Sequence, residues 1–281
     1  MKIIKSPSEL YNVLKKFKLA GKPIGFVPTM GALHAGHLSL IRQARKENTI
    51  VVVSIFVNPT QFGPKEDLQK YPRPLSKDLA LCRKEKVDFV FLPRVKDIYG
   101  EDFSTYVNVE KLSGVLCGAA RPGHFRGVAT IVAKLLNIAR PDVIYLGQKD
   151  AQQAVVIRKM VRDLNIPVKV KVMPTVREKD GLALSSRNAY LNRRERVEAL
   201  VLFRALNLAK LLINSGAKNP SRVISRMRQL INRKKSARID YIAIVGAQDL
   251  QPVKKISGEC LIALAVHLGR TRLIDNIIVR V

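Results

Sequence analysis

The sequence predicts an α/β protein in two parts. Residues 1–177 are expected to form a doubly wound parallel sheet of the Rossmann-like type, and residues 178–281 a smaller α+β domain. In the first part, short β-branched runs alternate with helical patterns, which is typical of βαβ units. In the second part, helical segments are followed by apolar strand-like segments, which is typical of an α+β unit. No internal repeat or low-complexity tract divides the chain further.

The first part begins with a helix and a βαβ unit. Ser6 is a suitable N-cap, Pro7 suits the first helical position, and Glu9 completes a capping box, so a helix is expected from there to about Gly21. The elements expected after it are strand 24–27, helix 38–46, strand 50–57, helix 75–86, strand 87–92, short strand 103–109, helix 128–139, strand 143–146, helix 150–164 and strand 168–172. The unbroken β-branched run of the second of these strands suits a strand that is covered on both faces of a parallel sheet.

The second part starts near residues 177–180, where the alternation of strands and helices ends. Its expected elements are helix 195–214, helix 220–232, and strands 240–245, 260–268 and 272–281. Helices followed by strands that look antiparallel indicate a separate, smaller unit.

Composition limits the kind of protein this can be. The chain has 281 residues, 47% of them hydrophobic, without a run of eighteen apolar residues, so a globular protein without a membrane span is expected. The first residues lack the apolar core of a signal peptide, which favours the cytoplasm. Three cysteines without a CxxC spacing indicate reduced thiols and argue against a disulfide framework or a zinc site.

The formal net charge of +28 predicts anionic partners, such as ATP, a carboxylic acid or nucleic acid. The charge is uneven, since residues 199–239 contain basic side chains and no Asp or Glu. A run of this kind is usually a solvated helical face, and no zinc-finger or RNP-type string accompanies it. Nucleic acid is therefore the less favoured partner.

A strand, a tight loop and a helix start meet at one stretch near the N-terminus. An apolar run ends at Pro28, a loop with Gly31 follows, and His34, Gly36 and His37 open the next helix. Backbone N–H groups and the helix dipole favour an anion at such a place. The two histidines are three residues apart and share one face of the first turn, so both can donate to phosphate oxygens. The alternative is an ordinary turn with two surface histidines, but this stretch holds two of the four histidines in the chain.

Two further loops follow expected strands or precede a helix. Gln61, in the loop after the second strand, offers a donor and an acceptor to a hydroxy acid, although an ordinary Pro/Gly turn explains the loop equally well. Residues 121–127 form a basic, glycine-rich turn before a helix. Its arginines could bind an anion, but a structural role at a subunit contact is slightly favoured.

Two basic loops later in the chain have the groups that a nucleotide needs. Lys149 and Asp150 start a helix at the carboxyl side of the expected sheet. The lysine can neutralise phosphate, and the aspartate can cap the helix or contact ribose or magnesium. Ser185, Ser186 and Arg187 can wrap a triphosphate if their loop closes on it, although such strings are also common at helix N-caps.

The motifs resemble those of a known family. His34-x-Gly36-His37 resembles the HIGH signature of nucleotidyl-transferring α/β enzymes, and residues 184–188 resemble the KMSKS element that accompanies it. Six strings are similar, in order, to strings of the pantothenate synthetase (pantoate–β-alanine ligase) family: residues 28–40, 54–62, 121–127, 147–153, 184–188 and 269–276. The resemblance covers nearly the whole chain, and the high charge is its main departure.

The resemblance implies an ATP-dependent condensation of (R)-pantoate with β-alanine through a pantoyl adenylate, releasing AMP and diphosphate. It implies Mg²⁺ as a cofactor and a homodimer. The catalytic groups implied are His37, His34, Lys149 and Arg187. The ATP site implied consists of Met30, Gly31, Ala32, Leu33, His34, Ala35, Gly36, His37, Gly147, Gln148, Lys149, Asp150, Val176, Leu184, Ser185, Ser186 and Arg187. Gln61 and Gln153 are expected to bind pantoate, and Asp78, with Asp150 as a second candidate, to hold the metal.

Two other classes compete with this interpretation. One is another HIGH-type nucleotidyltransferase or a small aminoacyl-tRNA-synthetase-like protein, although the sequence shows no separable anticodon-binding domain. The other is a nucleic-acid-binding protein on the same fold that uses the basic run 199–239.

Overall fold

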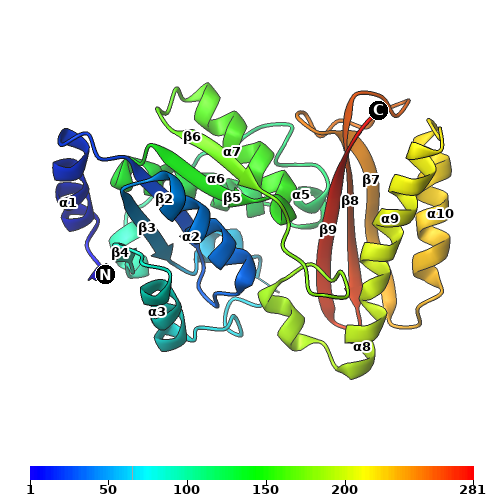
Figure 1. Ribbon diagram of the computed structural model, residues 1–281, viewed down its shortest axis with the longest axis horizontal. Coiled ribbons are helices and arrows are strands. Elements are labelled where there is room, and N and C mark those ends of the chain that lie inside the picture. Colours follow the sequence, from blue (N-terminus) through cyan, green and yellow to red (C-terminus); the bar gives the residue numbers. More distant parts are fainter. Residues whose placement is uncertain (65) are drawn as a thin grey trace.

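The computed structural model describes residues 1–64 and 66–281, which form two sheets with helices around them (Figure 1). The larger sheet is parallel and has the strand order β1-β4-β3-β2-β5-β6. Its strands are β1 (Lys2–Ile4), β2 (Ile24–Thr29), β3 (Ile50–Ile55), β4 (Phe89–Phe91), β5 (Val143–Gly147) and β6 (Lys169–Met173). The smaller sheet is antiparallel and contains β7 (Ala237–Gly246), β8 (Glu259–Leu268) and β9 (Thr271–Arg280).

Helices cover both faces of the parallel sheet. The helices of this part are α1 (Pro7–Leu19), α2 (Ala35–Glu47), α3 (Leu75–Lys84), α4 (Val95–Ile98), α5 (Cys117–Ala120), α6 (His124–Ala139) and α7 (Ala151–Asp163), with short 3₁₀ turns η1 (Pro59–Gln61) and η2 (Gln148–Asp150). Phe26 packs with α1, α6 and α7 on one face, and its neighbour Val27 packs with α2 and α3 on the other. The fold is therefore a doubly wound α/β sheet, as predicted.

The antiparallel sheet has apolar side chains on both faces. The second part of the chain contains η3 (Ser186–Tyr190), α8 (Arg193–Glu198), α9 (Leu200–Asn214) and α10 (Pro220–Asn232). Ile262 and Leu264 of β8 belong to the core beneath α9 and α10. Leu261 and Ala263, which alternate with them, belong instead to the main core around α6. The smaller sheet thus lies between its own helices and the parallel-sheet unit (Figure 1).

Most expected elements are present, two of them differ, and β1, α4 and α5 are additional. The strand expected over 103–109 is wrong: this segment is irregular, and Val107 N–H donates to the Thr130 hydroxyl of α6 instead of to a strand. β1 was not expected, because three residues are too short to show a period, yet it pairs in register with β4. The helix expected over 195–214 is two helices that meet at Ala199.

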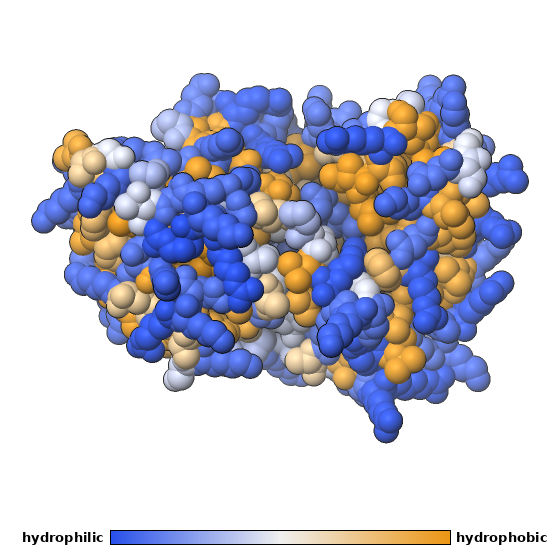
Figure 2. Space-filling model, viewed as in Figure 1, coloured by the Kyte–Doolittle hydropathy of each residue, from blue (hydrophilic) through white to orange (hydrophobic). Residues whose placement is uncertain are grey.

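Hydrophilic side chains cover most of the face seen in Figure 2, and apolar side chains gather mainly over its C-terminal half. Within residues 1–64 and 66–281, no helix is both long and apolar enough to cross a membrane. The loops after β2, β3, β5 and β6 lie at the carboxyl edge of the parallel sheet. In open α/β sheets, ligands bind at this edge.

Candidate active site

Asp78 holds the loop that follows β2. Its carboxylate accepts one hydrogen bond from the N–H of Ala32 and one from the N–H of Leu33, both at 2.8 Å. Gly31 has a φ of +80° and leaves room for this carboxylate, which lies 3.0 Å from the position of a Cβ there. Asp78 is 1% exposed and lies beneath the loop, outside the wall of the cleft. Its contacts thus give it the role of a loop anchor, and they do not support its expected role as a magnesium ligand.

The two histidines at the start of α2 both use Nδ1 to accept a backbone hydrogen bond. His34 is the N-cap, and its Nδ1 accepts from the N–H of Gly36 at 3.1 Å. His37 Nδ1 accepts from the N–H of His34 at 3.4 Å. Because both Nδ1 atoms are acceptors, each neutral ring carries its proton on Nε2. The rings lie 4.1 Å apart, so they form a pair of adjacent N–H donors.

Both imidazoles are neutral at neutral pH. Burial is the main cause that lowers the pKa of His34, to about 4, and nearby Lys149 lowers it further. Burial followed by the proximity of His34 lowers the pKa of His37 to about 3. The pair therefore offers hydrogen-bond donors to an anion but no positive charge of its own.

These histidines line a cleft of about 240 Å³ at the carboxyl edge of the sheet. Most residues predicted for the site lie on its wall: Met30, His34, Gly36, His37, Gln61, Gly147, Lys149, Asp150, Gln153, Val176, Leu184, Ser185, Ser186 and Arg187. Six predicted residues do not line it: Gly31, Ala32, Leu33, Ala35, Asp78 and Gln148. A second cavity, of about 660 Å³, adjoins the cleft and extends toward β9, and the two share Arg121, His124, Lys149, Asp150, Gln153, Ser185 and Arg187.

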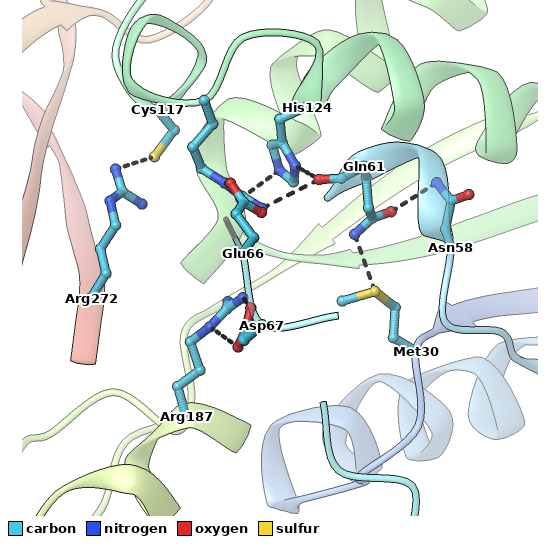
Figure 3. A network of polar contacts seen from close by, with 10 residues as sticks. Met30, Asn58, Gln61, Glu66, Asp67, Cys117, His124, Arg187 and Arg272 are labelled. Atoms are coloured by element: carbon cyan, nitrogen blue, oxygen red, sulfur yellow. Dashed lines mark hydrogen bonds and ion pairs between the residues drawn. The ribbon is translucent and has the colours of Figure 1, made fainter. Parts of the chain in front are cut away.

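The amide of Gln61 is oriented by two neighbours (Figure 3). Its Nε2 donates to Met30 Sδ at 3.1 Å, and its Oε1 accepts from Asn58 Nδ2 at 3.1 Å. Asn58 is buried, and its own Oδ1 accepts from the hydroxyls of Thr60 and Tyr99. Sequence reasoning missed Asn58 as a site residue. Its position at the carboxyl end of β3, directly before η1, was the available signal.

The glycine-rich turn 121–127 supports the main chain of Gln61. Arg121 Nη1 donates to His124 Nε2 at 3.0 Å, so the proton of this ring is on Nδ1, which donates to the Gln61 carbonyl at 2.7 Å. Burial, and then the charge of Arg121, lowers the pKa of His124 to about 4. Arg121 also forms a two-point ion pair with Glu66, at 2.7 and 2.5 Å (Figure 3). The turn therefore has a structural role, but it acts at the cleft wall.

The loop 184–187 reaches across to the loop after β2. Ser186 Oγ donates to the Ala32 carbonyl at 3.3 Å, although the two residues are 154 positions apart in the chain. Arg187 donates to both carboxylate oxygens of Asp67, from Nε at 3.1 Å and from Nη2 at 2.9 Å (Figure 3). The loop after β2 and the loop 184–187 thus face one cleft. Arg187, which is expected to bind phosphate, is paired with an acid.

The cleft lies at the carboxyl edge of a parallel α/β sheet and is lined by imidazole, lysine, arginine and hydroxyl groups. These features define a class, the α/β enzymes that act on anionic substrates. A family model described as pantoate-beta-alanine ligase matches residues 2–278. The chain belongs to this family. It is therefore a ligase that forms an amide bond, and family membership supports the joining of pantoate to β-alanine as pantothenate.

Relatives from several bacteria match over the full length. The chain is 54% identical over 281 residues to a pantothenate synthetase of Caldicellulosiruptor saccharolyticus, with all of both chains covered. It is 55% identical over 279 residues to one of Thermosipho melanesiensis, with 99% of each covered.

Solved structures agree with the fold. The pantothenate synthetase of Thermus thermophilus has a TM-score of 0.94 at 44% identity, and the match covers 99% of each chain. A pantoate-beta-alanine ligase of Francisella tularensis, described as complexed with beta-gamma ATP and beta-alanine, has a TM-score of 0.81 at 36% identity. That match covers 99% of this chain and 97% of the other.

Proposed function

We propose that the chain makes pantothenate in two steps that use ATP. A carboxylate oxygen of pantoate attacks the α-phosphorus of ATP, the bond to the bridging oxygen breaks, and diphosphate leaves. The amine of β-alanine then attacks the carbonyl carbon of the pantoyl adenylate, loses a proton, and expels AMP. The observation that carries the proposal is the meeting of the His34–His37 loop and the 184–187 loop at one cleft.

The residues of the cleft are suited to the first step. Pantoate is ionised at neutral pH and needs no general base. The phosphates need groups that offset their charge, and His34, His37 and Lys149 all line the cleft. Ser185, Ser186 and Arg187 lie on the facing loop. The complex of ATP analogue and β-alanine in the Francisella relative supports the same two substrates here.

Pantoate is proposed to bind beside Gln61 and Gln153. Both line the cleft, and the amide of Gln61 is already oriented by Asn58 and Met30. An oriented amide can donate to one oxygen of the hydroxy acid and accept from a hydroxyl.

Magnesium is proposed to bind with the triphosphate near Asp150. Mg²⁺ in such sites is usually held by one or two carboxylates together with substrate phosphates. Asp150 lines the cleft with its side chain half exposed, and its nearest cation, Lys149, is 3.9 Å away. Both carboxylate oxygens of Asp78, by contrast, accept hydrogen bonds from backbone N–H groups. The acid at the cleft wall is therefore the better candidate.

We also propose that residues 178–281 form the lid domain over this site, which excludes water from the mixed anhydride. The resemblance further implies a homodimer, which sedimentation analysis tests directly.

Labelled substrate tests the mechanism. Pantoate that carries heavy oxygen in its carboxylate is expected to transfer one labelled oxygen to AMP. Label in inorganic phosphate instead would contradict adenylation. Exchange of label between diphosphate and ATP should require pantoate, and His37→Ala should lower its rate on the order of a hundredfold with the fold intact. Exchange without pantoate, or tight RNA binding without AMP formation, would contradict the assignment.

A further inference from the structure

Asn276 of β9 clamps the turn that carries Lys149. Its Nδ2 donates to the carbonyls of Gln148, at 3.0 Å, and Lys149, at 2.9 Å. Its Oδ1 accepts from Gln148 Nε2 at 2.9 Å. The side chain is 4% exposed, so these bonds are shielded from water. The side-chain amide of Asn276 thus uses both donor hydrogens and its acceptor in bonds to a single turn. This turn lies 127 to 128 positions away in the chain.

Asp275, the preceding residue of β9, holds the base of the other basic loop. Its Oδ2 accepts from Arg177 Nη1 at 2.6 Å, and its Oδ1 accepts from Arg177 Nη2 at 2.9 Å and from the N–H of Asn276 at 2.8 Å. Arg177 also donates to the Gly181 carbonyl at 3.0 Å and lies over the ring of Phe203. This guanidinium thus fixes the start of the segment that leads to residues 184–187.

Strand alternation explains how neighbouring residues reach two loops. Successive side chains of a strand point to opposite faces of the sheet. Leu273 and Val279 of β9 pack into the core beneath α9 and α10, and Asp275 shares their parity. Ile274 packs against the main core, and Asn276 shares its parity. One strand therefore contacts the Gln148–Lys149 turn from one face and, from the other, Arg177 at the start of the segment that leads to residues 184–187.

We propose that Asp275 and Asn276 are positioning residues, which set the placement of Lys149 relative to the 184–187 loop and fix both loops to the antiparallel sheet. This rests on the proposed function, because these two loops are the ones assigned to ATP. Neither side chain is assigned a substrate contact. A displacement of about 1 Å of a catalytic group can lower a rate on the order of a hundredfold.

Asn276→Asp is the sharpest variant. It keeps the shape of the side chain but replaces two donors with an oxygen that faces two carbonyls, at Gln148 and Lys149. We expect the rate of pantoate-dependent exchange of diphosphate with ATP to fall about ten- to hundredfold. The KM for β-alanine in the complete reaction should change less. Arg280→Gln is the matched control, because Arg280 is also on β9 and pairs only with Glu259 at the surface among the contacts described.

A double-mutant cycle separates positioning from a general loss of structure. If Asn276 acts through Lys149, the double variant Lys149→Ala with Asn276→Ala should be about as slow as Lys149→Ala alone. If instead each substitution lowers the rate independently, so that the double variant shows the product of the two effects, the proposal is wrong.

Hydrogen exchange without substrates gives a readout that does not depend on the proposed function. Asn276→Ala should speed exchange in residues 147–153, Asp275→Asn should speed it in residues 177–187, and Arg280→Gln should change neither. If both variants loosen the same segment or none, the proposal is wrong, whatever the reaction. If these local changes in hydrogen exchange appear but the wild-type protein does not exchange diphosphate with ATP in the presence of pantoate, the proposed function fails. The contact between β9 and the two loops would still stand.

Discussion

The ion pair between Arg187 and Asp67 predicts that removing the acid strengthens nucleotide binding. A guanidinium that is bidentate to Asp67 must leave or share that carboxylate before it can bind phosphate. Burial alone would raise the pKa of Asp67, but the hydrogen bonds and charge of Arg187 hold this pKa below its usual value. The Asp67 carboxylate is therefore ionised at neutral pH and competes with phosphate for Arg187. Substitution of Asp67 removes this competition.

The magnitude follows from the exposure of the pair. The side chains of Arg187 and Asp67 are 31% and 25% exposed, so the pair lies between a surface pair and a buried one. We take the free energy of the Arg187–Asp67 pair as about 1 kcal/mol, near the upper end for exposed pairs. This free energy corresponds to a roughly fivefold change in affinity. Asp67→Asn should lower the Kd of a non-hydrolysable ATP analogue by about this factor.

Calorimetric titration of the analogue checks this prediction. Asp97→Asn is the matched control, because Asp97 forms the same two-point pair with Arg94, and neither residue lines the cleft. It should leave the Kd unchanged. An unchanged or weaker affinity in Asp67→Asn would refute the reasoning and show that the acid orients Arg187 for phosphate.

Two further predictions concern stability and the pantoate side of the cleft. The pKa values of His34, His37 and His124 lie near 3 to 4 in the folded state, below the usual 6.5, so the unfolded chain binds more protons between pH 4 and pH 6.5. Stability should therefore fall as the pH drops from 6.5 toward 4, by at most about 3 kcal/mol for each histidine. His124→Gln should make the fall of stability with pH less steep in urea titrations. The same pH dependence in the variant and the wild type would contradict the lowered pKa of His124. Gly127→Ala would place a Cβ 2.3 Å from a carbonyl oxygen of η1, so it should destabilise the fold by about 1–3 kcal/mol. Because η1 includes Gln61, the variant should also raise the KM for pantoate. An unchanged KM would contradict the link between η1 and pantoate binding.

Local sequence signals were sufficient for most of the parallel sheet, whereas most of the predicted residues on the cleft wall came from the family resemblance. The β-branched run at Ile50–Ile55 is buried along its whole length, as expected of a central parallel strand. The helix Pro220–Asn232 has the predicted bounds, because Asn219 caps it and proline suits its first turn. The residues around His34 and Lys149 meet because strand ends of a parallel sheet share one edge.

Contacts between distant side chains were not predictable in this way. The family resemblance implied Asp78 as a metal ligand, yet its carboxylate accepts hydrogen bonds from the N–H groups of Ala32 and Leu33, 45 to 46 positions away. The pairing of Arg187 with Asp67 spans 120 positions. Periodicity and capping patterns report on neighbours within a few residues, so they carry no information on such partners.

The alternating side chains of β8 have a consequence for how the molecule denatures. Because Leu261 and Ala263 belong to the main core while Ile262 and Leu264 belong to the core under α9 and α10, neither core can open without exposing apolar surface of the other. Heat should therefore melt both sheets in one calorimetric transition. A fragment that ends at residue 177 would expose the apolar surface that packs against β8, so it is expected to aggregate.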